Sequence, residues 1–495
     1  MFLPRSALGL HWARHVFRTQ NPVVASALSA RRWSPNTKLL LSGTGLVTVS
    51  ALSLYYGNPH LLGLQCDSHS TSSAQSKLPG RPDLSADDIN AELWKDQSTF
   101  DTGGVAKTCR VDVNYLESNR PIEDRHFVGT FDRGLLVGIF DGHAGDEAVK
   151  LASNVLPSYI GSAIKSSSSI GQALVQAFES FDRHLYNIPK EILPDFERLS
   201  ANQVSWIDIP AEARKRLLQA LSGCCASFAY VKNDKVTVAN SGDTRIFIGH
   251  RLSEGVYEAR DLTDDHQPGN PSELARMRAE HPGEHETVAS YHPSEVNGPL
   301  RVLGGMMPSR TLGDMKYKWP LAWHEKIDEI VLRRPRITKT SYRTRPNYKT
   351  PPYIIPTPEI REYGLNSNDE FMVLVTDGVS EVLTNQQVVD AVGKYLSTTT
   401  SRHETAEDGH TIVDSNGATH ILRETLGQIG EGEFGPHTLS RMLSLDPKTS
   451  RWIRDDITIM VVFFKGSEKH LKNTKKDVRL VIRPTDVSPL PKAKL

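Results

Sequence analysis

Residues 134–148 read GLLVGIFDGHAGDEA, and the apolar part of this stretch ends abruptly at Asp141. The apolar and small residues at 135–140 do not alternate with polar ones, which predicts a strand buried on both faces of a covered sheet. The acid therefore lies at the end of a strand. A carboxylate there is held by a rigid element and still reaches solvent, which suits metal binding or acid/base chemistry. An Asp-Gly turn leaving the strand is the alternative interpretation.

The same pattern occurs at three other places. Residues 371–383, FMVLVTDGVSEVL, end a second apolar run at Asp377, and residues 454–464, RDDITIMVVFF, begin a third run after Asp455. Glu123 and Asp124 form a fourth acidic cluster within ESNRPIEDRH. Carboxylates crowded at strand edges raise one another's pKa unless cations neutralise them. Mg²⁺ and Mn²⁺ prefer such oxygen ligands, and two ions about 4 Å apart can hold a phosphoryl group and activate water.

The order of the expected elements predicts the fold class. Strand-like runs cluster in the middle of the chain and are joined by Asn-Asp and Gly-Asp turns. Helical patterns lie before, between and after them, at 85–94, 211–221, 272–281, 385–396 and 419–426. This arrangement favours an α+β fold, a layered sandwich of two antiparallel β-sheets flanked by helices, over regular βαβ alternation.

Composition narrows the function class. The 495 residues are 38% hydrophobic and carry 58 basic and 58 acidic side chains, so no polybasic surface for nucleic acid is indicated. There are four cysteines, without CxxC spacing, which predicts neither a disulfide framework nor a structural zinc site. The adjacent Cys224 and Cys225 lie in an apolar run and are expected to be small buried hydrophobes.

The N-terminal region differs from the rest of the chain. Residues 1–38 contain arginines but no acidic residue, the composition of a mitochondrial targeting segment. Residues 39–56 are uncharged and just long enough to cross a bilayer, which makes them a candidate inner-membrane anchor, although their Ser, Thr and Gly content disfavours insertion. Residues 57–82 contain a Ser-rich linker.

The catalytic domain is expected over 83–465. Within it, we expect residues 316–352 to form a long, irregular and basic insertion. This insertion either faces solvent or binds an acidic surface of a partner protein. The tail 466–495 ends in Ala493-Lys494-Leu495, a variant of the peroxisomal address Ser-Lys-Leu.

Seven motifs in order carry a family resemblance: RPIEDRH, VGIFDGHAG, SGCCASFAYV with KVTVANSGDTRIFIG, DLTDDHQP with ELARMRAEHP, SRTLGDMKYKW, DEFMVLVTDGVSEVL and RDDITIMVVFF. Together they resemble the metal-dependent protein phosphatases of type 2C, from about residue 83 to 464. The variants PIEDR, MPSRTLGDMKYKW, RPNYKTPPY and RDDIT are most similar to the mitochondrial pyruvate dehydrogenase phosphatases within that family.

The resemblance implies a site with two divalent cations, Mg²⁺ or Mn²⁺. The Asp141 carboxylate would bridge them, and Asp124 and the Gly142 carbonyl would be further ligands. Asp377 and Asp455 would hold the second ion. Glu123 would act mainly through metal-bound water. Asp243 matches a position of a third, weaker metal site, and the alternative is that Asp243 is only a turn residue.

The resemblance also implies how the ester is cleaved. A hydroxide bridging the two ions attacks phosphorus directly, and His143 is the general acid for the departing oxygen, since an ordinary histidine can still be protonated near neutral pH. The alternative for His143 is a structural hydrogen bond in its loop. Most of the family has a phosphate-binding arginine where this chain has Asn119, followed by Arg120, so these two are the candidates for holding phosphate. Asp456 stands where many members have Asn.

These features predict a serine/threonine protein phosphatase that reactivates the pyruvate dehydrogenase complex, its expected partner, in the mitochondrion. The alternatives are a phosphatase for another mitochondrial or peroxisomal phosphoprotein, or a phosphoprotein-binding pseudophosphatase. If residues 39–56 stop in the inner membrane with their basic flank in the matrix, the catalytic domain faces the intermembrane space. Import followed by cleavage leaves it in the matrix, and the C-terminal tripeptide predicts an additional peroxisomal pool.

Overall fold

The computed structural model describes residues 84–200, 204–293, 298–332, 347–400, 414–429, 438–467, 471 and 483–484. The predicted targeting segment 1–38, hydrophobic segment 39–56 and linker 57–82 lie outside the described residues, as does most of the tail 466–495, including its terminal tripeptide. Within the described ranges, no helix has the length and apolarity needed to span a bilayer.

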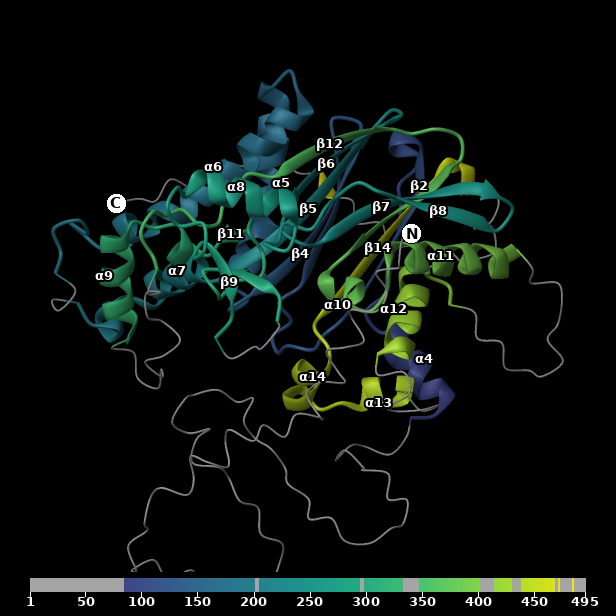
Figure 1. Cartoon of the computed structure of the whole chain (residues 1–495). Helices are drawn as coiled ribbons and strands as arrows, with labels where there is room; N and C mark the ends of the chain where they lie inside the picture. The colour runs from purple at the N-terminus through teal and green to yellow at the C-terminus, as the bar shows by residue number, and fades with distance from the viewer. Residues whose placement is uncertain are drawn as a thin grey trace, which may run out of the picture. The chain divides into compact units, whose positions relative to one another are not determined.

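The first sheet has six strands, of which consecutive members are antiparallel (Figure 1). Two of them are the apolar runs that the sequence places beside Asp455 and Asp377. In spatial order they are β1 (Ser98–Asp101), β2 (Thr108–Leu116), β14 (Ile457–Phe464), β13 (Asp369–Val375), β7 (Arg245–Ser253) and β8 (Val256–Asp261).

The second sheet contains the opening stretch. In spatial order its strands are β12 (Glu359–Gly364), β6 (Lys235–Ser241), β5 (Gly223–Lys232), β4 (Gly134–His143), β3 (Arg125–Phe131) and β15 (Arg483–Pro484), with β11 (Leu312–Gly313) paired to β5. The pairs are antiparallel except for the edge pair β15–β3, which is parallel. A separate two-stranded sheet joins β9 (Ala289–Tyr291) to β10 (Leu300–Val302).

The two large sheets pack against each other through alternate side chains. Val137 and Ile139 of β4 lie in one buried cluster with Leu374 of β13 and Val462 of β14. Since successive strand residues point to opposite faces, the neighbours of these residues face the helices instead. The strand β4 is buried along almost its whole length, as its unbroken apolar run predicts.

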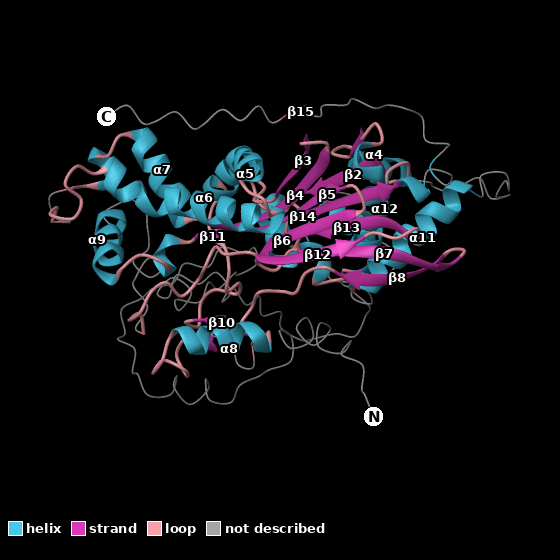
Figure 2. Ribbon diagram, turned by 90° about the horizontal axis from the view of Figure 1, so that it is seen from above, coloured by secondary structure: helices cyan, strands magenta, loops and turns pink. Residues whose placement is uncertain are grey.

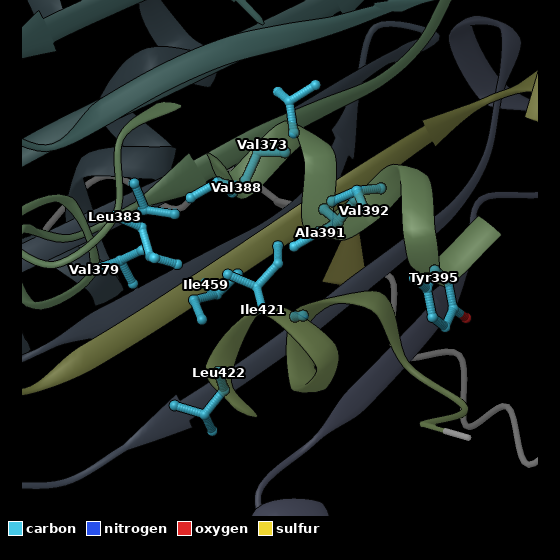
Figure 3. Close-up of a cluster of buried hydrophobic side chains, with 14 of the residues drawn as sticks. Val373, Val379, Leu383, Val388, Ala391, Val392, Tyr395, Ile421, Leu422 and Ile459 are labelled. Carbon is cyan, nitrogen blue, oxygen red and sulfur yellow. The ribbon is translucent and has the colours of Figure 1, made fainter. Parts of the chain in front are cut away.

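Helices cover the outer faces of both sheets. On the first sheet, α11 (Asn385–Thr400) and α12 (Gly417–Gln428) pack Val392 and Ile421 against Val373 and Ile459 (Figure 3). On the second sheet, the long helices α5 (Glu147–Ser166) and α6 (Ile170–Ile192) provide the cover, and the Phe178 ring meets the Phe228 ring edge-on at 6.1 Å. Figure 2 shows the strands as the central magenta block, with α5 and α6 beside one end and α11 and α12 beside the other. The predicted α+β sandwich is confirmed.

The predicted helices are confirmed within a few residues at their ends. Ser85 caps α4 (Ala86–Trp94) in a reciprocal capping box with Asp88, and α7 (Ala211–Leu221) has the expected bounds. The remaining elements are α8 (Pro271–Glu280), α10 (Asp377–Ser380), α13 (Thr438–Ser444), α14 (Pro447–Ile453) and the 3₁₀ turns η2 (Val105–Lys107), η4 (Trp206–Asp208), η5 (Met315–Tyr317) and η7 (Lys465–Ser467).

The description of 316–352 as irregular is wrong for its first half. A helix, α9 (Leu321–Leu332), occupies 321–332. Ile327, Ile330 and Val331 are fully buried on one side of it, so helical spacing of apolar residues was present but was masked by the basic residues that follow. Residues 333–346 lie outside the described residues.

Candidate active site

Acidic strand ends from both sheets meet at one place. Asp141 lies near the end of β4 in the second sheet, and Asp377 follows β13 in the first. The backbone N–H of Asp377 donates to Asp141 Oδ2 at 3.5 Å. The hydroxyl of Thr376 donates to Asp124 Oδ2 at 2.8 Å. The predicted gathering of Asp124, Asp141 and Asp377 is therefore seen in the structure.

Asp455 is tied to this group through Asn119 and Asp456. Asn119 Nδ2 donates to Asp455 Oδ1 at 3.3 Å and to Asp456 Oδ2 at 3.1 Å, and Asp456 Oδ2 also accepts from the Glu123 N–H at 2.7 Å. Glu123 lies at the same place, because its carboxylate accepts from the backbone N–H of Gly145, in the loop after β4, at 2.8 Å. The site is thus built from four acidic segments that lie between residues 123 and 455 of the sequence.

The carboxylates carry unfavourable charge interactions. Burial raises the pKa of Asp124, Asp141 and Asp377 well above the ordinary value, and neighbouring carboxylates raise it further. Burial also raises the pKa of Glu123 and Asp455. Positive charge at this place would oppose the rise in pKa and favour the ionised carboxylates.

A divalent cation would relieve this repulsion. Among the described residues, no three His, Cys, Asp or Glu side chains come together closely enough to hold an ion by themselves. Mg²⁺ usually takes only one or two carboxylates and keeps several waters, so one carboxylate from each sheet with a backbone carbonyl and water is a donor set that fits. The chemistry of these residues therefore suits Mg²⁺ or Mn²⁺.

The glycine after each aspartate is required by close backbone packing. A Cβ on Gly142 would lie 2.5 Å from the backbone oxygen of Glu123, to which the Gly142 N–H donates at 3.1 Å. A Cβ on Gly378 would lie 2.1 Å from the backbone oxygen of Asp456. The two Asp-Gly pairs thus let each strand end touch the neighbouring acidic segment.

Asp456 organises the segment that precedes β3. Its Oδ1 accepts from the backbone N–H groups of Ser118 at 2.5 Å and Asn119 at 2.8 Å. Its Oδ2 accepts from the Glu123 N–H at 2.7 Å and from Asn119 Nδ2 at 3.1 Å. The side chain is only 2% exposed. The negative charge of Asp456 is therefore matched by four N–H donors.

The two candidates for binding phosphate already have partners. The side-chain amide of Asn119 is held between Asp455 and Asp456, and Arg120 forms an ion pair with Glu117 at 2.8 Å on the surface. Neither contact tests the predicted role, which stays a prediction.

His143 is held by an acid that the sequence reasoning did not select. His143 Nε2 lies 2.7 Å from Asp314 Oδ2, and Asp314 also accepts from Thr311 Oγ1 at 2.7 Å. Burial alone would lower the pKa of His143, but the Asp314 carboxylate outweighs it, so this pKa is raised. Asp314 is fully buried in a loop, where no strand or helix pattern marks it as a functional acid.

Asp243, the candidate for a third metal site, lies in the turn after β6. Its Oδ2 accepts from Gln267 Nε2 at 2.9 Å, and its Oδ1 accepts from the Cys225 thiol at 3.1 Å. Burial is the main cause of the raised pKa of Asp141 and Asp377, and the nearby Asp243 carboxylate raises it further. The pKa of Glu381, one turn after Asp377, is also raised, first by burial and then by Asp455 and Asp243. Sequence reasoning missed Glu381.

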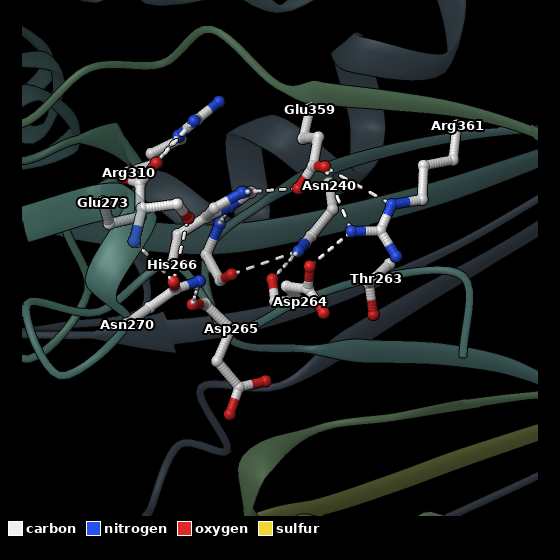
Figure 4. Close-up of polar contacts among 12 residues, drawn as sticks. Asn240, Thr263, Asp264, Asp265, His266, Asn270, Glu273, Arg310, Glu359 and Arg361 are labelled. Atoms are coloured by element: carbon white, nitrogen blue, oxygen red, sulfur yellow. Dashed lines mark hydrogen bonds and ion pairs between the residues drawn. The ribbon is translucent and has the colours of Figure 1, made fainter. Parts of the chain in front are cut away.

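A polar network fixes the loop beside Asp243 (Figure 4). His266 Nδ1 accepts from the Gly242 N–H at 3.2 Å, and its Nε2 donates to Glu359 Oε2 at 3.2 Å. Glu273 of α8 accepts from Ser309 Oγ at 2.6 Å and from Arg310 Nε at 3.0 Å. Because Ser309 and Arg310 lead directly into the strand before Asp314, this network ties α8 to the active-site loop.

Cys224 and Cys225 are buried in β5, as predicted, and both are free thiols.

Comparisons with known proteins find similarity to protein phosphatases. A family model described as Protein phosphatase 2C matches residues 117–412. The mitochondrial pyruvate dehydrogenase (acetyl-transferring) phosphatase 1 of Homo sapiens is 30% identical over 436 residues, covering 74% of this chain and 80% of that protein. A protein phosphatase 2C homologue of Schizosaccharomyces pombe is 31% identical, covering 72% and 80%. The crystal structure of a serine-threonine phosphatase 2C from Toxoplasma gondii is 18% identical with a TM-score of 0.43, covering 72% and 95%.

Proposed function

The chain belongs to the protein phosphatase 2C family and is a protein-serine/threonine phosphatase, and from this premise we propose that it uses two divalent cations to dephosphorylate pyruvate dehydrogenase. The observation that carries the metal proposal is the meeting of Asp141 and Asp377 from two sheets, with raised pKa values that positive charge would relieve.

We assign the cations to the residues that the sequence selected. Asp124, Asp141 and the Gly142 carbonyl would hold one ion, with Glu123 acting through water. Asp141, Asp377 and Asp455 would hold the other, for which these three carboxylates would have to come closer together than they lie here. Asp243 is the proposed ligand of a third, weaker ion. When bound, such ions supply a water of lowered pKa and neutralise charge on the phosphoryl oxygens.

The protein's own residues complete the reaction. In the hydrolysis, a bond forms between water oxygen and phosphorus while the bond to the serine or threonine oxygen breaks. His143 would give its proton to that departing oxygen, and the Asp314 carboxylate would hold the ring and favour its protonated form. No side chain is phosphorylated in this scheme.

The substrate proposal rests on the relatives and on the N-terminal composition. The human relative is named for its action on pyruvate dehydrogenase and for the mitochondrion, and residues 1–38 have the composition of a mitochondrial targeting segment. The names of the reported relatives lend no support to a peroxisomal pool or to an inner-membrane association.

The experiment uses the purified chain with a phosphoserine peptide and Mn²⁺. We expect turnover by the wild type, loss of turnover after EDTA treatment with recovery on adding Mn²⁺, and no turnover by D141A. An inert wild type would favour the phosphoprotein-binding pseudophosphatase and contradict the enzyme mechanism. A second assay compares phosphorylated pyruvate dehydrogenase with phosphorylated casein, and equal kcat/KM on both would contradict the substrate assignment.

A further inference from the structure

The site needs a positive side chain for the substrate phosphate. A phosphoserine carries nearly two negative charges at neutral pH, and the residues around it here are carboxylates. The side-chain amide of Asn119 has no charge, and its NH₂ group donates to Asp455 and Asp456. If Asn119 stays in this position, another residue must supply the cation beside the metals.

Most arginines around the site already have partners. Arg454 donates to the backbone oxygen of Glu117 at 2.8 Å, and Arg125 donates to that of Asp124 at 2.6 Å. The arginines with such partners are Arg125, Arg245, Arg301 and Arg454, whereas the surface ion pair of Arg120 with Glu117 leaves the predicted role of Arg120 open.

Arg451 differs from these. It lies in the last turn of α14, its side chain is exposed, and the described part of the chain contains no hydrogen-bond or ion-pair partner for its guanidinium. An arginine that is exposed and unengaged near several carboxylates is available to a ligand.

The position of α14 brings Arg451 to the site. Ser450, the preceding residue, donates its hydroxyl to the backbone oxygen of Ser118 at 2.8 Å. Ser118 is adjacent to Asn119, and Asp455 follows Arg451 by four residues. Figure 1 shows α14 below α10, the helix that begins at Asp377. Ser118 and Asn119 donate their backbone N–H groups to Asp456, and Asn119 Nδ2 donates to Asp455, so the Ser450 contact anchors the end of α14 directly beside the acidic centre.

We propose that Arg451 binds the phosphate group of the substrate and supplies the positive charge that the Asn119 side chain lacks. The planar guanidinium can donate two parallel hydrogen bonds to phosphate oxygens, which a lysine cannot reproduce. This inference rests on the proposed function, because it assigns a residue to the substrate of that reaction.

The test compares R451A and R451K with K448A, measured at saturating Mn²⁺ on a phosphoserine peptide. Lys448 is exposed on the same helix, so K448A removes the same charge without touching the proposed contact. Hydrogen bonds to charged groups predict that R451A raises KM, and the inhibition constant of inorganic phosphate, about tenfold or more. R451K should recover only part of this loss, and K448A should change both constants less than about twofold.

Further measurements on R451A and the wild type complete the test. Added guanidinium ion at non-denaturing concentration should restore part of the phosphate affinity of R451A, and the variant's melting temperature should match that of the wild type, since the side chain is exposed. If more Mn²⁺ restores the KM of R451A, the residue acts on the ions and the inference is overturned. An active wild type with an R451A variant of unchanged KM and phosphate inhibition also overturns it, whereas an inactive wild type overturns the proposed function.

Discussion

Replacing Asp456 tests whether this buried carboxylate holds the segment that carries Asn119 and Glu123. Asp456 accepts four N–H donors, three of them backbone groups, and is 2% exposed. Alanine removes all four acceptor contacts. Leaving buried donors without partners costs about 1–3 kcal/mol each, so with partial rehydration we expect D456A to lower the free energy of unfolding by about 3–6 kcal/mol.

Asparagine provides the matched comparison. Its carbonyl oxygen can replace Oδ1 and keep the contacts to the Ser118 and Asn119 N–H groups, while its NH₂ group faces the two donors that Oδ2 accepted. We therefore expect D456N to cost about half as much as D456A, about 2–3 kcal/mol. Both variants remove the same charge, so relief of repulsion with Asp124 and Asp455 cancels in the difference between them.

The assay is urea unfolding of the full chain in EDTA, followed by tryptophan fluorescence. D446A is a second control, because Asp446 caps α14 from an exposed position and its loss should cost only about 1 kcal/mol. Equal unfolding midpoints for D456A and D456N, or a D456A cost no larger than that of D446A, would refute the assigned role of Asp456.

Three other predictions follow from the contacts described above. D314N removes the carboxylate that holds His143, so kcat on a phosphoserine peptide should fall about 10- to 100-fold with little change in KM, and less on p-nitrophenyl phosphate, whose leaving group needs no proton; equal losses on both substrates would contradict the general-acid role. Burial would raise the pKa of Glu273, but hydrogen bonds from two arginines outweigh it and lower that pKa. The stabilisation from the ionised Glu273 is therefore complete above its ordinary pKa and is lost as pH falls below about 4 toward the lower folded pKa. When the free energy of unfolding is measured against pH, E273Q should lack this loss. Parallel curves for E273Q and the wild type would contradict the assigned role of Glu273. G378A places a Cβ 2.1 Å from a backbone oxygen and should destabilise by about 2–3 kcal/mol, whereas G427A, at a helical glycine with no atom within 4 Å, should not; similar melting temperatures for the two variants would contradict the packing account.

The acidic strand ends could be predicted from the sequence because each is marked locally. An apolar run that stops at Asp141 or Asp377 identifies both the strand and its end, and sheet packing then brings the ends together. Helices with a clear cap or apolar face, such as 86–94 and 211–221, were also predictable for local reasons.

No local sequence pattern predicts the long-range contacts that complete the site. His143 meets Asp314 across 171 positions of sequence, and Ser118 meets Asp456 across 338. Asp314 lies in a loop without periodicity, so only the tertiary structure reveals its partner. The helix at 321–332 was missed for a different reason, since its apolar face was read together with the basic residues that follow it.

The most direct measurement of the central claim is anomalous diffraction from a crystal of the wild-type protein soaked in Mn²⁺. We predict manganese peaks at the meeting point of the two sheets, in contact with the carboxylates of Asp141 and Asp377, and loss of those peaks in D141A. Soaked crystals without manganese at these carboxylates, from protein that is active in the same Mn²⁺ solution, would contradict the account.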